Sequence, residues 1–99
     1  MSFVLTHPEA LATAAGHLNG VGSVLAAQNE AAAAATTALP PAAADEVSAL
    51  TATQFSAHAA LYQAVSAQAT AIHEVFTSVL GASATSYSAT EAANTIATS

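Results

Sequence analysis

A proline pair, Pro40 and Pro41, interrupts a chain that otherwise favours α-helix on both sides. Alanine is abundant before and after the pair, and Leu, Gln and Glu also favour helix, whereas strand-forming runs of β-branched and aromatic residues are missing. Two adjacent prolines remove two backbone N–H donors, and the first disfavours a helical conformation for Leu39. The sequence therefore predicts an all-α fold in which two antiparallel helices form a hairpin.

Signals at the helix starts set the expected boundaries. Pro8 followed by Glu9 suits the first turn of a helix, which we expect to cover about residues 8–38. Asp45 suits the N-cap of the second helix, because its carboxylate can accept hydrogen bonds from backbone N–H groups of the first turn.

The end of the second helix is expected at Gly81, the residue type that commonly follows the last helical residue. This helix would then cover about residues 45–81. The predicted organisation is one hairpin domain over residues 1–81 and a flexible C-terminal tail over residues 82–99.

Apolar positions recur in alternating steps of three and four along both predicted helices, as in a coiled coil. These two seams consist of Leu11, Ala14, Leu18, Val21, Leu25, Gln28 and Ala32 in the first helix, and Phe55, His58, Tyr62, Val65, Ala69, Ile72, Phe76 and Val79 in the second. One seam on each helix would close the hairpin. Further apolar residues lie off the seams: Val24, Val47, Leu50, Leu61, Val75 and Leu80.

Two helices cannot cover apolar groups on both faces, so the sequence predicts a second helical protein that covers the remainder. The small residues Gly16, Gly20 and Gly22 would let another helix approach closely. The expected partner interface consists of Leu11, Leu18, Val21, Leu25, Phe55, Leu61, Tyr62, Val65, Ile72, Phe76 and Val79. Periodicity does not decide which apolar face packs within the hairpin and which meets the partner.

The charge is one-sided, because the chain has no Lys or Arg and a formal net charge of −6. Nucleic-acid binding rests largely on cationic side chains, so this balance argues against such a partner. The absence of cysteine excludes disulfides and thiolate metal sites. The N-terminus lacks the cationic and apolar regions of a conventional signal peptide, and polar residues interrupt the uncharged stretch 47–73, which argues against a membrane span.

Four histidines, His7, His17, His58 and His73, are the candidates for metal or acid–base chemistry. None is paired with another at i and i+4, and Glu74 points about 100° away from His73 around a helix. Serine-nucleophile motifs are also missing. We expect polar histidines at or near a helix interface, and no enzyme, metal, cofactor or small-molecule substrate.

Beyond Gly81, the segment Ser83 to Glu91 is rich in small polar residues and contains one aromatic, Tyr87. If this segment is helical, Tyr87 and Glu91 fall on the same face one turn apart. A Tyr-x-x-x-Glu pattern alone is weak, since it arises often by chance.

Three features together resemble the mycobacterial PE family, which is named for its Pro-Glu pair: Pro8-Glu9, the alanine-rich hairpin with a Pro-Pro turn, and Tyr87-x-x-x-Glu91. The opening Met1-Ser2-Phe3-Val4, the block from Thr36 to Leu50, and Tyr62-Gln63 followed by Val65-Ser66-Ala67 are also similar to that family's domain. The resemblance spans the whole chain.

The resemblance implies a PE protein that consists of the domain alone and forms an obligate heterodimer with a PPE protein, completing a four-helix bundle. It also implies that a type VII (ESX) secretion system exports the folded pair from the cytoplasm to the cell surface or beyond. In this family Tyr87 and Glu91 would be the export signal, together with a Trp-x-Gly turn on the partner. A secretion chaperone would bind the PPE protein and reach this chain only indirectly. The alternative is a self-associating or membrane-active protein of the cell envelope.

Overall fold

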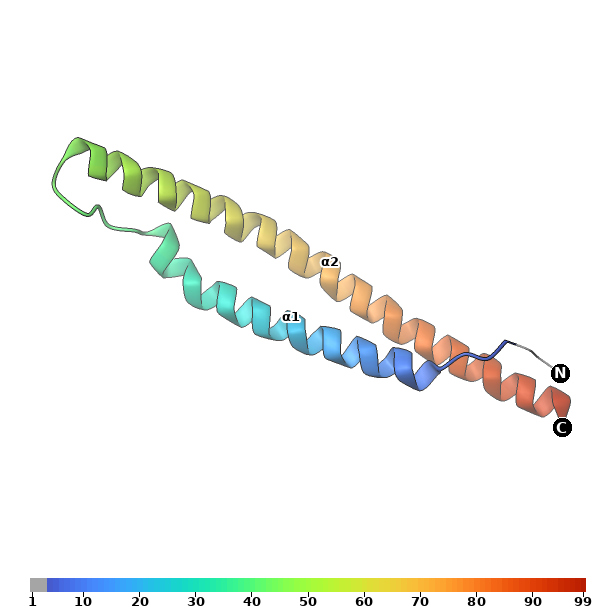
Figure 1. Cartoon of the computed structure of the whole chain (residues 1–99). Coiled ribbons are helices and arrows are strands. Elements are labelled where there is room, and N and C mark those ends of the chain that lie inside the picture. Colours follow the sequence, from blue (N-terminus) through green and yellow to red (C-terminus); the bar gives the residue numbers. More distant parts are fainter. Residues whose placement is uncertain (1–3) are drawn as a thin grey trace. The chain divides into compact units, whose positions relative to one another are not determined.

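A computed structural model describes residues 4–99, so Met1 to Phe3 of the family-like opening lie outside the described residues. It contains two helices, α1 (Pro8–Thr37) and α2 (Glu46–Thr98), joined by the connection 38–45 (Figure 1). The described residues contain no strand. The predicted all-α hairpin is confirmed.

The start of α1 follows from the residues before it. The backbone carbonyl of His7 accepts hydrogen bonds from the N–H groups of Ala10 and Leu11, at 3.1 and 3.2 Å, which closes the first turn around Pro8. At the other end, the Thr37 hydroxyl donates to the Ala33 carbonyl over 2.6 Å, one turn before the helix stops. The predicted span of α1 is confirmed to within a residue.

Asp45 caps α2 as expected. Its Oδ2 accepts a hydrogen bond from the Ser48 backbone N–H at 3.0 Å, and its Oδ1 accepts one from the Ser48 hydroxyl at 2.6 Å. The Asp45 carbonyl accepts from the Ala49 N–H at 3.1 Å, which begins the helical ladder. These bonds, the Ser48 hydroxyl first, hold the pKa of the Asp45 carboxyl below its ordinary value.

The predicted end of the second helix at Gly81 is wrong, because α2 continues to Thr98. No described glycine has a positive φ, so Gly81 does not adopt the left-handed conformation that ends many helices. The residues after it include several alanines and no proline, and nothing there breaks the helix. Residues 82–98 therefore form the last turns of α2, and the flexible tail predicted there is replaced by helix.

The fold divides into two compact units, each containing a segment of both helices. We call residues 4–22 with His73–Ser99 the terminal unit, and Ser23–Ile72 the loop unit. In the loop unit, the Leu39 backbone N–H of the connection donates to the Ser56 hydroxyl of α2 at 3.3 Å. In each unit the two helical segments run antiparallel.

The helices meet through small and polar side chains. The buried residues among those described are Ala52, Thr77 and Ala84, and Ala84 is only 4% exposed. They belong to a stripe along α2, the inner stripe, whose members are buried or half-buried: Ser48, Ala52, Ser56, Ala59, Gln63, Ser66, Thr70, His73, Thr77, Gly81, Ala84 and Glu91. Short side chains let two helix backbones approach closely, which large side chains would prevent.

Most members of the large apolar seams lie outside the contact between the helices, which answers the question that periodicity left open. Leu11 and Leu18 are half-buried, but Phe76 is 54% exposed and Ile72 is 71% exposed. The inner stripe of α2 lies one residue after the seam, as Ser56 does after Phe55. Because each residue turns the helix by about 100°, this single step moves the seam out of the contact between the helices.

Candidate functional site

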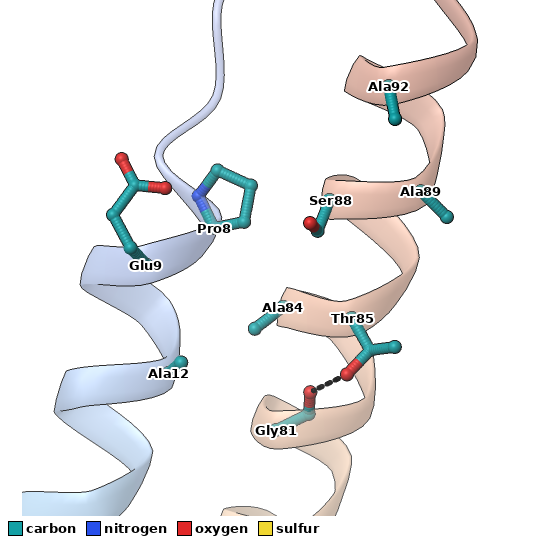
Figure 2. A pocket seen from close by; sticks show the side chains of 9 residues that line it. All are labelled: Pro8, Glu9, Ala12, Gly81, Ala84, Thr85, Ser88, Ala89 and Ala92. Atoms are coloured by element: carbon teal, nitrogen blue, oxygen red, sulfur yellow. Dashed lines mark hydrogen bonds between the residues drawn. The ribbon is translucent and has the colours of Figure 1, made fainter.

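The Pro-Glu pair lies at the start of α1, where the terminal unit has an open groove. Figure 2 shows Pro8 and Ala12 turned toward α2, and Ala84 and Ser88 turned toward α1. Pro8 is half-buried, and its fixed φ and missing N–H suit the first helical position. Pro8 therefore both starts α1 and contributes to its contact with α2.

Glu9 has a different environment from its neighbour. It also lines the groove, beside Pro8 in Figure 2, but its side chain is 81% exposed. The His7 Nδ1 lies 4.0 Å from the Glu9 Oε1, a distance at which an exposed pair contributes little. The main local role of Glu9 is a negative charge in the first turn of α1, where the helix dipole favours it.

Tyr87 and Glu91 both lie in the helical part of α2 beyond Gly81, so they sit one turn apart as the motif requires. Tyr87 is 47% exposed. Glu91 is half-buried, and its Oε1 accepts hydrogen bonds from the Thr6 hydroxyl at 2.8 Å and from the Thr6 backbone N–H at 3.2 Å. The two motif residues thus have separate environments, one open to solvent and one engaged by the N-terminal segment.

Large apolar side chains are exposed along both helices, and we call this set the apolar face. In α1 it consists of Val21, Val24 and Leu25, and in α2 of Val47, Leu50, Phe55, Leu61, Tyr62, Val65, Ile72, Val75, Phe76 and Val79. Nine of the eleven residues predicted for a partner interface belong to this set, and the other two, Leu11 and Leu18, are half-buried. The helical pair leaves these side chains available for contact with another surface.

Sequence reasoning missed a polar contact in the loop unit, centred on Asn29. The Asn29 Nδ2 donates to the Ser66 hydroxyl at 2.5 Å, and its Oδ1 accepts from the Tyr62 hydroxyl at 2.8 Å. The Asn29 carbonyl also accepts from the Gln63 Nε2 at 3.1 Å. An asparagine in a helix interior was the available signal, since asparagine disfavours that position unless its amide has partners. Asn19 of the same helix carries this signal too, so the signal alone does not single out Asn29.

His73 and Gly22 form a second contact, in the terminal unit. The His73 Nε2 donates to the Leu18 carbonyl at 2.6 Å, and the ring lies directly over Gly22. A Cβ at Gly22 would lie 2.7 Å from the His73 Cδ2. The prediction of histidines at or near a helix interface is confirmed for the half-buried His73, whereas His7, His17 and His58 are exposed.

Across residues 4–99, no three His, Cys, Asp or Glu side chains are grouped closely enough to hold a metal ion. Within the same residues, neither helix has a stretch that is both long and apolar enough to cross a membrane.

The sequence matches a known family over nearly its whole length. The model of the PE family matches residues 4–94. This chain belongs to the PE family. It is 59% identical to the PE family protein PE13 of Mycobacterium tuberculosis over 99 residues, which cover the full length of both proteins.

Other PE relatives are longer than this chain. The PE family protein PE8 of the same species is 52% identical over 97 residues, but the match covers 35% of that protein. The PE-PGRS family protein PE_PGRS33 is 56% identical over 94 residues, which cover 20% of its length in one strain. The chain therefore spans about a third of the length of PE8 and about a fifth of the length of PE_PGRS33.

Proposed function

We propose that this chain is a secreted PE protein that forms an obligate heterodimer with a PPE protein. The observation that carries the proposal is the apolar face, where Ile72 and Phe76 are more than half exposed while the described residues bury only small side chains. Large apolar side chains exposed in this number on two helices indicate a surface for another macromolecule. Membership of the PE family supports a PPE protein as that partner.

The size of the exposed surface fits a missing partner. A compact folded monomer of 9.6 kDa is expected to expose about 5,100 Å². This chain exposes 7271 Å², an excess of roughly 2,000 Å² over that expectation. An obligate protein pair buries a surface of this order, at about 25 cal/mol per Å² of apolar area.

The spacing of the larger side chains suits two further helices. On α1, Leu11, Leu18 and Leu25 lie seven positions apart, and on α2 Phe55, Tyr62 and Phe76 are separated by multiples of seven. Such repeats present rows of side chains between which the residues of another long helix can insert. A PPE partner that supplies two helices would complete a four-helix bundle.

Tyr87 and Glu91 support export of the pair by a type VII (ESX) secretion system. Their helical spacing and the exposure of Tyr87 fit a signal that is read on the folded protein. The pair would assemble in the cytoplasm and reach the cell surface or the medium. A secretion chaperone would act through the PPE protein.

Co-expression tests the pairing. We expect this chain to aggregate or lack cooperative unfolding when expressed alone, and to co-purify as a 1:1 complex with a PPE protein. A soluble, monomeric chain that unfolds cooperatively without a partner would contradict the obligate pair. Stable homo-oligomers, or binding of the purified chain to phospholipid vesicles, would favour the self-associating or membrane-active alternative.

Substitution of Tyr87 tests the export signal. We expect Tyr87→Ala to abolish secretion while the partner complex forms normally, because Tyr87 lies on an exposed part of α2. Thr90→Ala is a matched control, since Thr90 is exposed on the same turns and its hydroxyl donates to the Ser86 carbonyl within α2. Normal secretion of Tyr87→Ala would remove Tyr87 from the signal.

A further inference from the structure

Glu91 joins two parts of the sequence that lie 85 positions apart. The Thr6 hydroxyl and the Thr6 backbone N–H both donate to the same carboxylate oxygen, Oε1. Hydrogen bonds to an ionised carboxylate are stronger than those between neutral groups. These two hydrogen bonds hold the segment before Pro8 against the last turns of α2.

The fastened segment meets α2 one helical turn beyond the exposed aromatic of the motif. Glu91 is one helical turn beyond Tyr87 on the same face of α2. Thr6 follows Val4 and Leu5, whose side chains are about three-quarters exposed.

We propose that Glu91 is a positioning residue, and that Thr6 belongs to the same export element as Tyr87 and Glu91. Glu91 holds residues 4–7 on α2 near Tyr87, and the secretion system binds Tyr87 together with that segment. Glu91 does not work as a bare charge, since it is half-buried and its Oε1 is already engaged by two donors. This inference rests on the proposed export function and deepens it.

Two pairs of variants separate positioning from charge. Thr6→Val removes the hydroxyl donor at nearly constant shape, and Thr6→Ser retains it. Glu91→Ala removes the acceptor, whereas Glu91→Gln removes the charge but keeps an amide oxygen that can accept both hydrogen bonds. All four are made in the full chain, together with its PPE partner.

The first measurement is hydrogen exchange at the Thr6 backbone N–H in the purified complex. We expect exchange about tenfold faster or more in Glu91→Ala, which loses the acceptor, and rates close to wild type in Glu91→Gln. Thr6→Ser should also stay close to wild type. These results would establish the contact without any reference to secretion.

The second measurement is secretion of the same variants. We expect Glu91→Ala and Thr6→Val to reduce it, and Glu91→Gln and Thr6→Ser to retain most of it. Unchanged exchange at Thr6 in Glu91→Ala would overturn the inference, as would loss of secretion in Glu91→Gln with Thr6 still protected. Failure of the export function itself would be distinct, because Tyr87→Ala would then be secreted normally whatever the exchange at Thr6.

Discussion

Gly22 and His73 occupy one crowded point of the terminal unit. The His73 ring donates to the Leu18 carbonyl, and only the missing side chain of Gly22 leaves room for the ring in that position. The other two glycines of α1, Gly16 and Gly20, have open space where a Cβ would lie. Three glycines in one helix therefore have different physical roles, although their sequence context is similar.

Replacing Gly22 with Ala should destabilise the protein. The added Cβ would meet the ring at 2.7 Å and force His73 away from the Leu18 carbonyl. Overpacking of this kind costs about 1–3 kcal/mol, which exceeds the gain in helix propensity of at most about 1 kcal/mol. Chemical unfolding followed by circular dichroism, on the partner complex, measures the difference.

Gly20→Ala is the matched control for that experiment. It makes the same chemical change two positions away, where nothing lies within 4 Å of the new Cβ. We expect it to stabilise the protein by up to about 1 kcal/mol through helix propensity alone. Equal effects of the two substitutions would show that the contact between His73 and Gly22 does not form.

Asp45 should make the start of α2 sensitive to pH. Its pKa is lowered in the folded chain, chiefly by the Ser48 hydroxyl and then by the Ser48 backbone N–H. A lowered folded-state pKa means that the stabilisation is fully present above the ordinary pKa of the group, and is lost as pH falls through the folded value. Hydrogen exchange at the Ser48 N–H, followed from neutral to acidic pH, should show this loss.

Asp45→Asn keeps a residue that can cap the helix but removes the carboxyl group that titrates. Asparagine is also a good N-cap residue, so the first turn of α2 should persist at neutral pH. Because the amide does not titrate, the exchange rate at Ser48, corrected for the intrinsic effect of pH, should no longer change in the acidic range. A pH response equal to that of the wild type would assign the effect to another group.

At the scale of whole elements, the sequence predicted both helix starts but not the end of α2. Pro8 and Asp45 act locally, through φ, a missing donor and a carboxylate cap, so their effect can be read from neighbouring residues. Gly81 ends a helix only when the chain adopts a left-handed conformation there, and the packing of Ala84 against α1 favours continued helix instead. A tertiary contact of this kind cannot be predicted from the residues next to Gly81 in the sequence.

The face of each helix that packs within the hairpin also depends on tertiary contacts, which periodicity does not show. Periodicity identified the residues of the apolar face, but it left open which face of each helix packs within the hairpin. The stripe that packs consists of residues such as Ala52 and Thr77, because short side chains allow the helices to approach closely. The Thr6–Glu91 contact was also beyond reach, since it links positions 85 residues apart.

Breaking α2 at Gly81 tests whether the last turns are a continuous helix. Gly81→Pro removes a backbone donor and clashes with the preceding turn, at a cost of about 3 kcal/mol in a helix interior. We expect residues 82–98 to lose amide protection, and the Thr6 N–H to lose it with them. The control Gly81→Ala has open space for its Cβ and should instead raise protection there. If residues 82–98 already exchange freely in the wild type, the continuous helix is wrong.

At the scale of the whole molecule, both the charge and the burial of side chains indicate that few contacts stabilise the hairpin. The chain carries −6 and no Lys or Arg, so its helices are held by small apolar contacts and by hydrogen bonds such as those of Asn29. Contacts between short side chains bury little apolar area, and a chain of 99 residues has a narrow margin of stability even with a good core. Any salt bridge to Lys or Arg across an interface would need a cation from the partner. Binding of the proposed partner would therefore add directly to the stability of the fold.

Phe76→Ala should have a different effect in the free chain and in the complex. In the hairpin alone Phe76 is 54% exposed, so the ring contributes little to the packing between the two helices, and its loss should change the helix content of the free chain little. If the PPE partner buries the ring fully, the same substitution should weaken the bundle by about 3–5 kcal/mol, through lost transfer energy and a cavity.

The control for Phe76→Ala is a substitution at a neighbouring exposed residue that has no large apolar side chain. Ser78→Ala changes an exposed residue on the same turn, and it should alter the unfolding of the complex by no more than about 0.5 kcal/mol. Thermal unfolding of the complexes formed by co-expression measures the effect of each substitution. An unchanged melting temperature for Phe76→Ala in the complex would place this side chain outside the interface and move the partner to another part of the apolar face.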